Sequence, residues 1–431
     1  MLTMDPEQCE FATGVAARAT VAAETTRKSH RIGCDRTIDP SATLTRILPF
    51  LPVCGITRVA NLTGLDAVGV PVVAVCRPNS RSVAVSQGKG LTLAAAKASG
   101  IMEAIEAYHA EFATLALYRD TLAGLERRGA TVADVRALPK TSAVHFRPDT
   151  KVLWTAAEDV VSGQSVLVPY EMVHTDYTLP LPPGSGCFLM SSNGLASGNH
   201  RLEAVSHGLC ELVERDAVTL HGLSSAAERA SRRVDLSTIE DPSCLAVLQR
   251  FQAAGLAVTV HDVTSDVGIA VFRCDVSEKN EAILGSMPPL RGTGCHPRRE
   301  IALLRALTEA AQTRVTMISG ARDDLSPWWY SDRDRVAAVR RSFFESFERN
   351  AERRFDEAPH FDSPLLSSDV AWEIGQLERA GMSRTLVVDL TKPEMGIPVA
   401  RVIVPGLEPM REAPGYVPGE RARRQMLRGT T

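Results

Sequence analysis

The sequence predicts an α+β fold in which long helices with acidic stripes are combined with mixed sheets. Three observations support this class. The 431 residues are 44% hydrophobic and 5% aromatic, which suits a globular enzyme core rich in Ala, Val and Leu. Long alanine- and leucine-rich segments show helical periodicity, and short β-branched runs lie between them. The length is enough for one large domain or for two to three ordinary ones.

The bulk properties exclude several classes of protein. The formal charge of −3 gives no electrostatic reason to expect nucleic acid as a partner. No apolar run approaches the roughly 20 residues that span a bilayer, and the first residues lack the pattern of a signal peptide. The nine cysteines form no CxxC pair, which argues against a zinc ribbon or a disulfide scaffold. We therefore expect a cytoplasmic protein with reduced thiols and no membrane segment.

The first half of the chain shows helix and strand signals in turn. Polar, irregular residues at 1–30 predict a flexible leader. A short helix is predicted in "DPSATLTRILPFL", capped by Asp39 or Ser41, and a β-branched strand at 69–78. Residues 84–117 begin with a glycine-rich turn and continue as a long alanine-rich helix. A hairpin is predicted in "KVLWTAAEDVVSGQSVLVPYEMVH", because alternating apolar residues flank the turn "VSGQS".

The second half begins with a Pro-, Gly- and Ser-rich loop at 179–200. This loop is too long for a simple connector, which indicates a functional segment. A second long helix is predicted at 202–219 and two strands at 255–276. A glycine-containing turn with a third long helix follows at 291–320, and charged, exposed helices at 326–370.

The end of the chain predicts two more strands, in "RTLVVDLT" and "IPVARVIVPG". Residues 412–431 form a basic tail, which we expect to be flexible. No low-complexity tract interrupts the chain, which favours continuous folded structure between the leader and the tail.

Three of the helices carry acids or amides at one-turn spacing, each after a Gly- or Ser-rich turn. Residues three or four apart share one face of a helix, so each set forms a stripe. The stripes comprise Ser99, Glu103 and Glu106; then Glu203, His207, Glu211 and Glu214; then Arg305, Glu309 and Gln312. Their flanking residues are largely apolar, and desolvated carboxylates are costly unless cations offset them.

Cations therefore form part of the prediction. Carboxylate and amide oxygens suit hard ions such as Mg²⁺, which also binds phosphate oxygens. Lys89, in the "SQGKG" turn, and Arg215 are placed to contact phosphate, and helices that follow glycine turns present free N–H groups. The pattern predicts a nucleoside triphosphate held through several Mg²⁺ ions. The competing interpretation of each single acid pair is an ordinary solvated helix face.

The sequence lacks the complete motifs of three other classes of site. The "QGKG" segment lacks the spacing and the Ser or Thr of a P-loop. Ser192 has no GxSxG elbow, and no base can be assigned to it or to Cys187. His296 follows Cys295 without further ligands at metal spacing. The sequence thus argues against a P-loop NTPase, a serine hydrolase and a transition-metal site.

At the acidic stripes the sequence resembles the YcaO family. The three signature blocks correspond, in order, to "SQGKG…ASGIMEAIEA", "SSNGLASGNHRLEAVSHGLCELVERDA" and "GTGCHPRREIALLRALTEAAQTR". The resemblance extends over about 31–411, which is identified as the YcaO domain. It implies an ATP-binding α+β fold that differs from kinases and P-loop proteins.

The resemblance also implies roles for particular residues. As Mg²⁺ ligands it implies Glu103, Glu106, Glu211 and Glu214. As contacts to the nucleotide or its phosphates it implies Lys89, Ser99, Asn199, Glu203, Arg215, Glu309 and Gln312. Lys89 and Arg215 are expected to be catalytic by neutralising charge. Arg36 and Thr43 fall where the family has further nucleotide contacts, whereas Arg314 lies roughly 140° round the helix from Glu309.

The family's chemistry is the activation of a backbone amide in a peptide or protein. A nucleophile adds to the carbonyl, ATP phosphorylates the oxyanion, and loss of phosphate leaves an azoline, a thioamide or an amidine. The end of this chain lacks the proline-rich tail of azoline-forming members, and phrases such as "GITRVANLTGLD" resemble members that install thioamides with a TfuA partner. The resemblance therefore implies a sulfur donor and a TfuA-like partner, and leaves a homodimer open.

Three alternatives are kept. The first is cyclodehydration of Cys, Ser or Thr in a ribosomal precursor peptide. The second is a nucleotide-binding scaffold without turnover, which the complete set of acidic and basic residues disfavours. The third is a metal-dependent hydrolase, which would not explain why Lys89, Asn199 and Arg215 lie among the acids.

Overall fold

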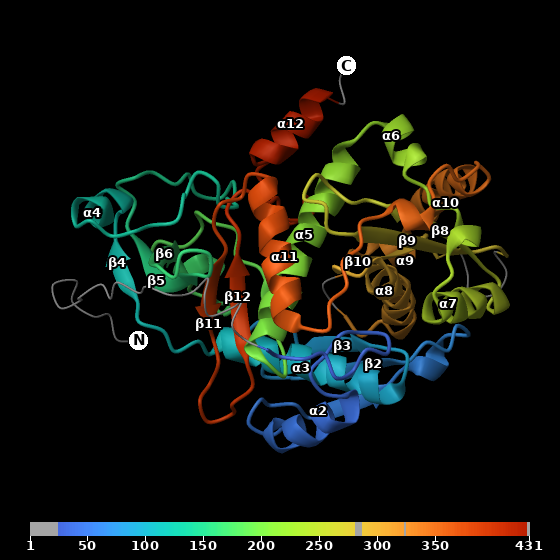
Figure 1. The fold of residues 1–431 in the computed structure, drawn as a ribbon, viewed down its shortest axis with the longest axis horizontal. Helices are drawn as coiled ribbons and strands as arrows, with labels where there is room; N and C mark the ends of the chain where they lie inside the picture. The colour runs from blue at the N-terminus through green and yellow to red at the C-terminus, as the bar shows by residue number, and fades with distance from the viewer. Residues whose placement is uncertain (1–24, 281–286, 323–324, 429–431) are drawn as a thin grey trace.

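Three antiparallel sheets organise the computed structural model, which describes residues 25–280, 287–322 and 325–428 (Figure 1). The first sheet has the order β1 (Arg58–Asn61), β2 (Val72–Cys76), β3 (Val85–Lys89). The second has the order β10 (Leu290–Cys295), β9 (Val271–Glu278), β8 (Leu256–Asp262). The third has the order β4 (Tyr118–Asp120), β5 (Val152–Asp159), β11 (Leu386–Asp389), β12 (Val399–Ile403), β7 (Leu195–Ser197), and β6 (Ser165–Pro169) also pairs with β5.

The α+β class predicted from the sequence is confirmed, and among the described residues parallel pairing occurs at isolated bridges such as Val132 to Leu167. Every pair between the strands named above is antiparallel. A short connection, such as the one between β2 and β3, places the next strand antiparallel to the one before it. A parallel pair needs a crossover of a dozen or more residues.

Three long helices pack on these sheets and bring them together. Helix α3 (Leu93–Glu111) covers β2 and β3, and α8 (Arg299–Ser319) covers β9 and β10. Helix α5 (Arg201–Leu223) runs through the middle of the molecule and contacts β7 and β12 of the third sheet and β10 of the second (Figure 1). Each acidic stripe of the sequence therefore lies on a helix that is anchored to a sheet.

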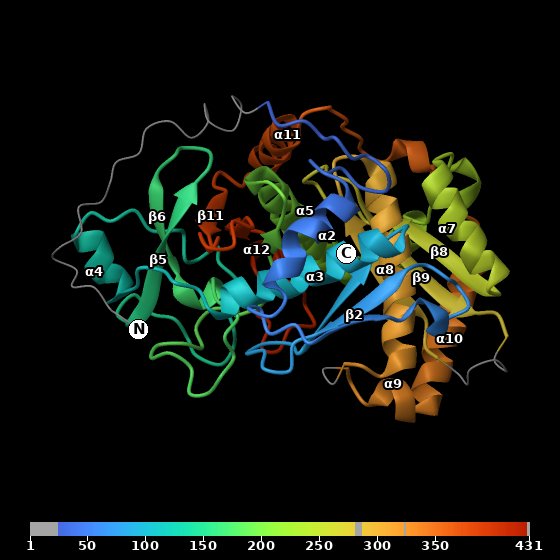
Figure 2. The ribbon, with the colours of Figure 1, turned by 90° about the horizontal axis from the view of Figure 1, so that it is seen from below.

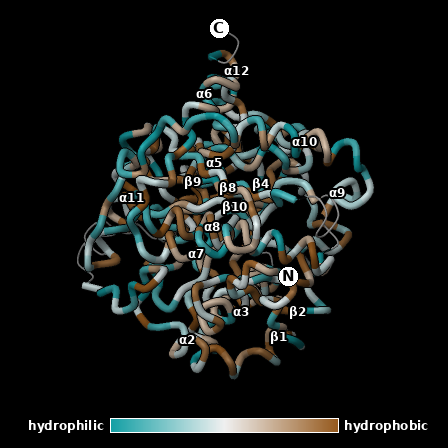
Figure 3. The backbone as a smooth tube through the Cα atoms, turned by 90° about the vertical axis from the view of Figure 1, so that its right-hand side faces the viewer, coloured by the Kyte–Doolittle hydropathy of each residue, from teal (hydrophilic) through white to brown (hydrophobic). Residues whose placement is uncertain are grey.

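Shorter helices surround this centre. They are α2 (Pro40–Ile47), α4 (Leu122–Arg127), α6 (Ala226–Ser231), α7 (Pro242–Ala253), α9 (Trp328–Ser331), α10 (Arg333–Phe347), α11 (Leu366–Arg379) and α12 (Glu420–Arg428). Single 3₁₀ turns lie at Leu48–Phe50, Thr63–Leu65, Tyr170–Met172, Leu236–Thr238 and Phe355–Glu357. Helix α2 packs on α3 (Figure 2). Hydrophobic residues are concentrated in the centre of the molecule, around β8, β9 and β10 (Figure 3).

Two glycine-rich segments that the sequence analysis interpreted as turns are strands. "VSQGK" forms β3 and "LRGTGC" forms β10. Their glycines permit a helix to lie directly against the strand, because a Cβ on Gly88 would come within 2.0 Å of the Ala96 carbonyl oxygen. A Cβ on Gly292 would likewise come within 2.2 Å of Ala306 O. Glycine here serves close backbone packing rather than a phosphate-binding loop.

Several expected elements are found where the sequence placed them. Asp39 caps α2 by accepting hydrogen bonds from Ser41 N and Ala42 N. Strands β5 and β6 form the expected hairpin, and the two strands expected at 255–276 are β8 and β9. The segment at 326–370 is helical only in part, at α9, α10 and the start of α11, with mostly irregular chain at 348–365, and Val336 and Phe343 of α10 are buried.

Both ends of the described chain are more firmly attached than expected. The leader predicted at 1–30 lies mostly outside the described residues, but Lys28 is buried and its Nζ donates to Asp35 at 2.9 Å and to Asp369 at 2.8 Å. In the tail, α12 packs on α5, and Arg421 Nε lies 2.8 Å from Asp216 Oδ1. These buried ion pairs explain why neither segment is free there. Across the described ranges, no helix combines the length and apolarity needed to cross a membrane.

Candidate active site

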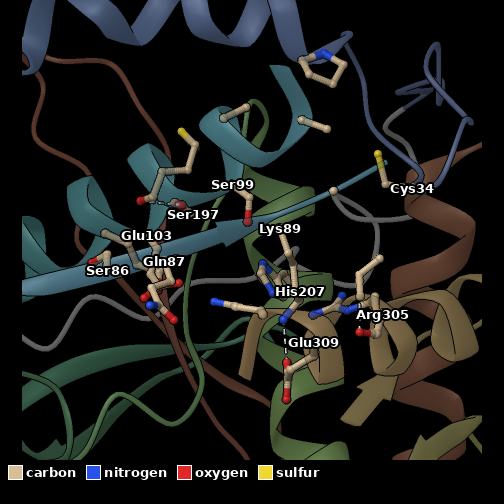
Figure 4. A pocket seen from close by; sticks show the side chains of 18 of the residues that line it. Cys34, Ser86, Gln87, Lys89, Ser99, Glu103, Ser197, His207, Arg305 and Glu309 are labelled. Carbon is tan, nitrogen blue, oxygen red and sulfur yellow. Dashed lines mark hydrogen bonds and ion pairs between the residues drawn. The ribbon is translucent and has the colours of Figure 1, made fainter. Parts of the chain in front are cut away.

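A cavity of about 920 Å³ lies where α3, α5 and α8 approach one another (Figure 4). It is lined by all the residues that the sequence analysis proposed as metal or nucleotide contacts: Lys89, Ser99, Glu103, Glu106, Asn199, Glu203, Glu211, Glu214, Arg215, Glu309 and Gln312. Arg36, Thr43 and His207 line it as well. The three stripes, which are far apart in sequence, therefore face a single space.

The stripes on α3 and α8 are held in the same way. The backbone N–H of Thr293 on β10 donates to Glu309 Oε1 at 3.2 Å. A backbone hydrogen bond from Gln87 on β3 likewise reaches the Glu103 carboxyl. In both cases the glutamate follows its strand partner by 16 residues, since 103 − 87 = 16 and 309 − 293 = 16. The repeated spacing seen in the sequence thus corresponds to a repeated strand–helix unit.

Thr293 joins the stripes on α5 and α8. Its Oγ1 lies 2.7 Å from Glu214 Oε1 and 3.3 Å from Glu309 Oε1. The sequence analysis did not identify Thr293, because a threonine on a strand gives no signal until the fold brings it between two helices. This hydroxyl fixes the position of Glu214 relative to Glu309.

The basic residues pair with acids inside the cavity. Lys89 Nζ lies 2.5 Å from Glu309 Oε2, and Figure 4 marks this ion pair with a dashed line. Arg215 lies 3.4 Å from Glu214 Oε1 and 3.8 Å from Glu211 Oε1. Both cations therefore lie among carboxylates, where they can also meet the phosphate groups of a ligand.

The acids of α3 and α5 are under electrostatic strain in the absence of cations. Burial raises the pKa of Glu106 well above its usual value, and Glu211 and Glu103 raise it further. Burial also raises the pKa of Glu103, and it raises the pKa of Glu211 to about 7. Glu309 differs: burial alone would raise its pKa, but Lys89 and Arg215 hold that pKa below its usual value. Cations beside Glu103, Glu106 and Glu211 would relieve the strain.

The carboxylate and amide oxygens that line the cavity are ligands that suit Mg²⁺. Within the described ranges, no three His, Cys, Asp or Glu side chains come together as a ready-made metal cluster. The carboxylates instead line a wide cavity, which suits ions that keep water and share phosphate oxygens as ligands. His207 and His296 line the same cavity, and burial lowers the pKa of each imidazole well below its usual value.

Both carboxylate oxygens of Glu203, which is expected to contact the nucleotide, already accept hydrogen bonds from the protein. Its Oε1 accepts from Thr37 N at 2.5 Å and from Thr37 Oγ1 at 2.7 Å. Its Oε2 accepts from Asn199 N at 2.8 Å, and Asn199 Nδ2 donates to Thr43 Oγ1 at 3.1 Å. Glu203 therefore fixes the chain at Thr37 and Asn199, and Asn199 and Thr43 face the cavity beside it.

Two residues whose roles the sequence left open lie outside the cavity lining. Arg314 is buried on the far side of α8, where its guanidinium lies 3.0 Å from Asp66 Oδ2 and 3.2 Å from Glu278 Oε1. This agrees with its position round the helix from Glu309. Cys187 is buried, and its N–H donates to Glu171. Arg305 was noted only as part of a stripe, yet it faces the cavity near Lys89 and His207 (Figure 4).

Comparison with known proteins agrees with this geometry. Residues 87–408, about three quarters of the chain, match the model of the family described as YcaO cyclodehydratase, ATP- and Mg²⁺-binding. A protein encoded in the tfuA 3′ region of Rhizobium leguminosarum bv. trifolii is 37% identical over 87% of this chain and 89% of its own length. A Methanothermobacter thermautotrophicus protein is 34% identical over 86% of this chain and 94% of its own.

Solved structures show the same fold. A heterocyclase in complex with substrate and cofactor has a TM-score of 0.71 and 25% identity, covering 90% of this chain. This chain spans about half of that heterocyclase, 54% of its length. YcaO from Methanopyrus kandleri, bound with AMPPCP and Mg²⁺, has a TM-score of 0.70 and 22% identity, covering 92% of this chain and 99% of its own. Sequence, fold and cavity agree that the chain belongs to the YcaO family of ATP- and Mg²⁺-binding proteins.

Proposed function

We propose that this protein is an ATP- and Mg²⁺-dependent enzyme that converts a backbone amide of a peptide or protein into a thioamide, using an external sulfide and a TfuA-like partner. The observation that carries this proposal is a single cavity in which three acidic stripes face Lys89 and Arg215, in a member of the YcaO family. The finer choice of thioamide is supported by the relative encoded in a tfuA 3′ region.

We assign Mg²⁺ to the two acid pairs on α3 and α5. Glu103, Glu106, Glu211 and Glu214 line the same cavity, and burial raises the pKa of the first three. Bound cations would let these acids ionise together. The remaining assignments are to the nucleotide and its phosphates: Lys89, Ser99, Asn199, Glu203, Arg215, Glu309 and Gln312.

The reaction needs an amide oxygen to become a leaving group. Sulfide adds to the amide carbon, and the resulting oxyanion takes the γ-phosphoryl group of ATP, which releases ADP. The C–O bond then breaks with loss of phosphate, a proton leaves, and the carbon keeps sulfur as C=S. In this sequence Lys89 and Arg215 would neutralise charge on the phosphoryl oxygens, and the glutamates would hold the cations that do the same.

Azoline formation is the second candidate, because a heterocyclase is among the matching structures, at 25% identity. There the nucleophile is a Cys, Ser or Thr side chain of the substrate, and the product has lost water. Since both reactions share the phosphorylated intermediate, the cavity alone supports them equally. The relative in the tfuA 3′ region favours the external sulfide.

Mass spectrometry of the product tests this choice directly. Purified protein is incubated with ATP, Mg²⁺, sulfide, a TfuA-like protein and candidate peptides, with Lys89→Met as an inactive control. Exchange of one oxygen for sulfur, dependent on sulfide and ATP, is the expected result. Loss of water without sulfide would establish azoline formation instead. ATP turnover with neither change would contradict both assignments.

Nucleotide binding is expected to weaken as the pH falls through about 7. Burial raises the pKa of Glu211 to about 7, so below that pH a proton occupies the carboxyl that the cation needs. Calorimetry in buffers of different ionisation enthalpy should show proton release when Mg²⁺ and ATP bind near neutral pH. Glu211→Gln removes this group, so proton release should fall, while Glu103, Glu106 and ATP itself still contribute. Equal proton release in wild type and variant would contradict the prediction.

A further inference from the structure

One arm of the cavity contains none of the residues assigned to ATP or Mg²⁺. We call it the neutral arm, and it is lined by Ser82, Val83, Thr175, Tyr177, Ser192 and Leu195. Tyr177 N donates to Arg81 O at 3.0 Å, which joins the segments that carry Tyr177 and Ser82, and Leu195 N donates to Ser192 O at 2.8 Å within the third segment. Its side chains are hydroxyls, a phenol and aliphatic groups, with no ionised group among them.

The buried Glu111 carboxylate fixes the segment of the arm that contains Ser82. The Glu111 carboxylate accepts from Ser80 Oγ at 2.7 Å and from Ser82 N at 3.2 Å, and it pairs with the buried Arg77 at 2.7 Å. On the surface, Arg81 pairs with Asp176 at 2.7 Å. The arm is therefore a preformed surface, which lowers the entropy cost of binding a ligand there.

Arg401 on β12 ties the remaining two segments of the arm together. Its Nε donates to Val173 O at 3.1 Å and its Nη1 to Asn193 O at 2.8 Å. Arg401 is 1% exposed, and within the described residues its Nη2 has no hydrogen-bond partner. The Thr175 hydroxyl, on a residue that is 2% exposed, is also without a partner in that part of the chain. Unpaired buried groups are costly, and a ligand in the arm can satisfy the Thr175 hydroxyl, which lines the cavity, whereas Arg401 is not among the lining residues.

The arm adjoins the proposed Mg²⁺ ligands. Leu195 begins β7, which packs on α3 and α5, the helices that carry Glu106 and Glu211. The six lining residues of the arm carry no ionised side chain, and the nearby Arg401 cation is attracted to Glu211 and Glu106. Lys89 and Arg215 pair with acids on α8 and α5. The arm therefore suits an uncharged ligand beside the site of phosphoryl transfer.

The rim of the arm opens to solvent while its floor is closed. Val83 is 36% exposed and Tyr177 37% exposed, whereas Leu195 and Thr175 are buried. An extended polypeptide can cross such a rim, and its backbone offers both a carbonyl and an N–H to hydroxyl groups along the wall. We propose that the neutral arm binds the backbone of the acceptor peptide and presents its amide to the α3 and α5 glutamates. This inference rests on the proposed function.

Photo-crosslinking tests this site. The probe is a library of uncharged, N-acetylated and C-amidated heptapeptides that carry a diazirine, added with AMPPCP and Mg²⁺. Crosslinks in wild type are expected within residues 82–85 and 175–177. Val83→Arg, which adds bulk and charge at the rim, should reduce crosslinking at least tenfold. Val144→Arg is the matched control, since Val144 is 43% exposed on a loop that does not line the cavity.

Three outcomes would overturn the proposal. They are crosslinks confined to other surfaces, equal labelling of Val83→Arg and wild type, and no labelling of wild type at saturating probe. Calorimetry of AMPPCP binding, run on the same three proteins, keeps this result separate from the proposed function. If Mg²⁺-dependent AMPPCP binding is intact in all three while labelling fails, the neutral arm is wrong and the nucleotide site stands.

Discussion

Alanine in place of Glu214 is expected to abolish Mg²⁺-dependent ATP binding. Glu214 is 5% exposed, lies 3.4 Å from Arg215 and accepts a hydrogen bond from Thr293 at 2.7 Å. Its removal deletes a proposed cation ligand and frees both neighbours to move. Losing a partner of a metal ligand costs about 10–100-fold in affinity, so losing the ligand itself should cost at least about 100-fold. Calorimetric titration of ATP with and without Mg²⁺ measures this directly.

Two controls make the result specific to the cavity. Glu345→Ala removes an exposed glutamate on α10 and should bind ATP as wild type does. Thr293→Val keeps the carboxylate but removes the hydroxyl that positions it, and an intermediate loss is expected. If Glu214→Ala unfolds at the wild-type temperature and binds ATP with wild-type affinity, the cations must bind elsewhere.

Methionine in place of Arg314 is expected to destabilise the fold by about 3–5 kcal/mol, because the buried Asp66 carboxylate loses its counter-charge and Glu278 is left with the more distant Arg340, at 3.8 Å. Arg314 is 3% exposed and holds Asp66 and Glu278, so it links α8 to β9 and to the turn after β1. Chemical unfolding followed by circular dichroism measures the change. We expect the substitution to lower stability without a direct effect on the cavity, because this guanidinium does not line it.

The same variant separates two roles for Arg314. The sequence places this residue in the family pattern near nucleotide contacts, whereas its structural surroundings assign it to the core. ATP affinity per folded molecule is therefore expected to be unchanged at low temperature. Arg333→Met, on an exposed position of α10, should change neither quantity. A selective loss of ATP binding in Arg314→Met with normal stability would restore the nucleotide role.

The acidic stripes could be predicted because helical spacing is local information. Glu103 and Glu106 share a face whatever surrounds the helix, so their joint orientation is evident from the sequence. Their convergence with Glu211 and Glu214 was proposed from three repeats of one pattern, and the cavity lining brings all four together. What those side chains bind remains a proposal that the titrations above will test.

The glycine segments were misread because glycine has two uses that look alike in a sequence. Gly88 and Gly292 lie within strands, where each lets a helix backbone approach closely. A turn and a tightly covered strand both demand the absence of a Cβ, so composition alone favoured the more frequent turn. The β-branched or hydroxyl neighbours of Gly292, such as Thr293, are the signal that could have indicated a strand.

Long-range contacts were beyond sequence reasoning. Thr293 and Arg401 act only after strands from distant parts of the chain reach the cavity. Lys28 was assigned to a flexible leader because the surrounding residues are polar, yet it meets Asp369 across 341 residues of chain. A lone charge in an irregular segment shows no partner until the tertiary structure supplies one.

The placement of the acid pairs on separately anchored helices has a consequence for ion selectivity. The α3 pair rests on the first sheet, the α5 pair lies between the third sheet and the second, and Glu309 and Gln312 rest on the second. The spacing between the pairs is therefore set by how the sheets pack, since no single loop carries the ligands. Mg²⁺ demands shorter and more regular coordination than Ca²⁺. Core residues far from any ligand would thus tune which divalent cation the protein accepts, and a repacked core would change the preferred metal before it changed the fold.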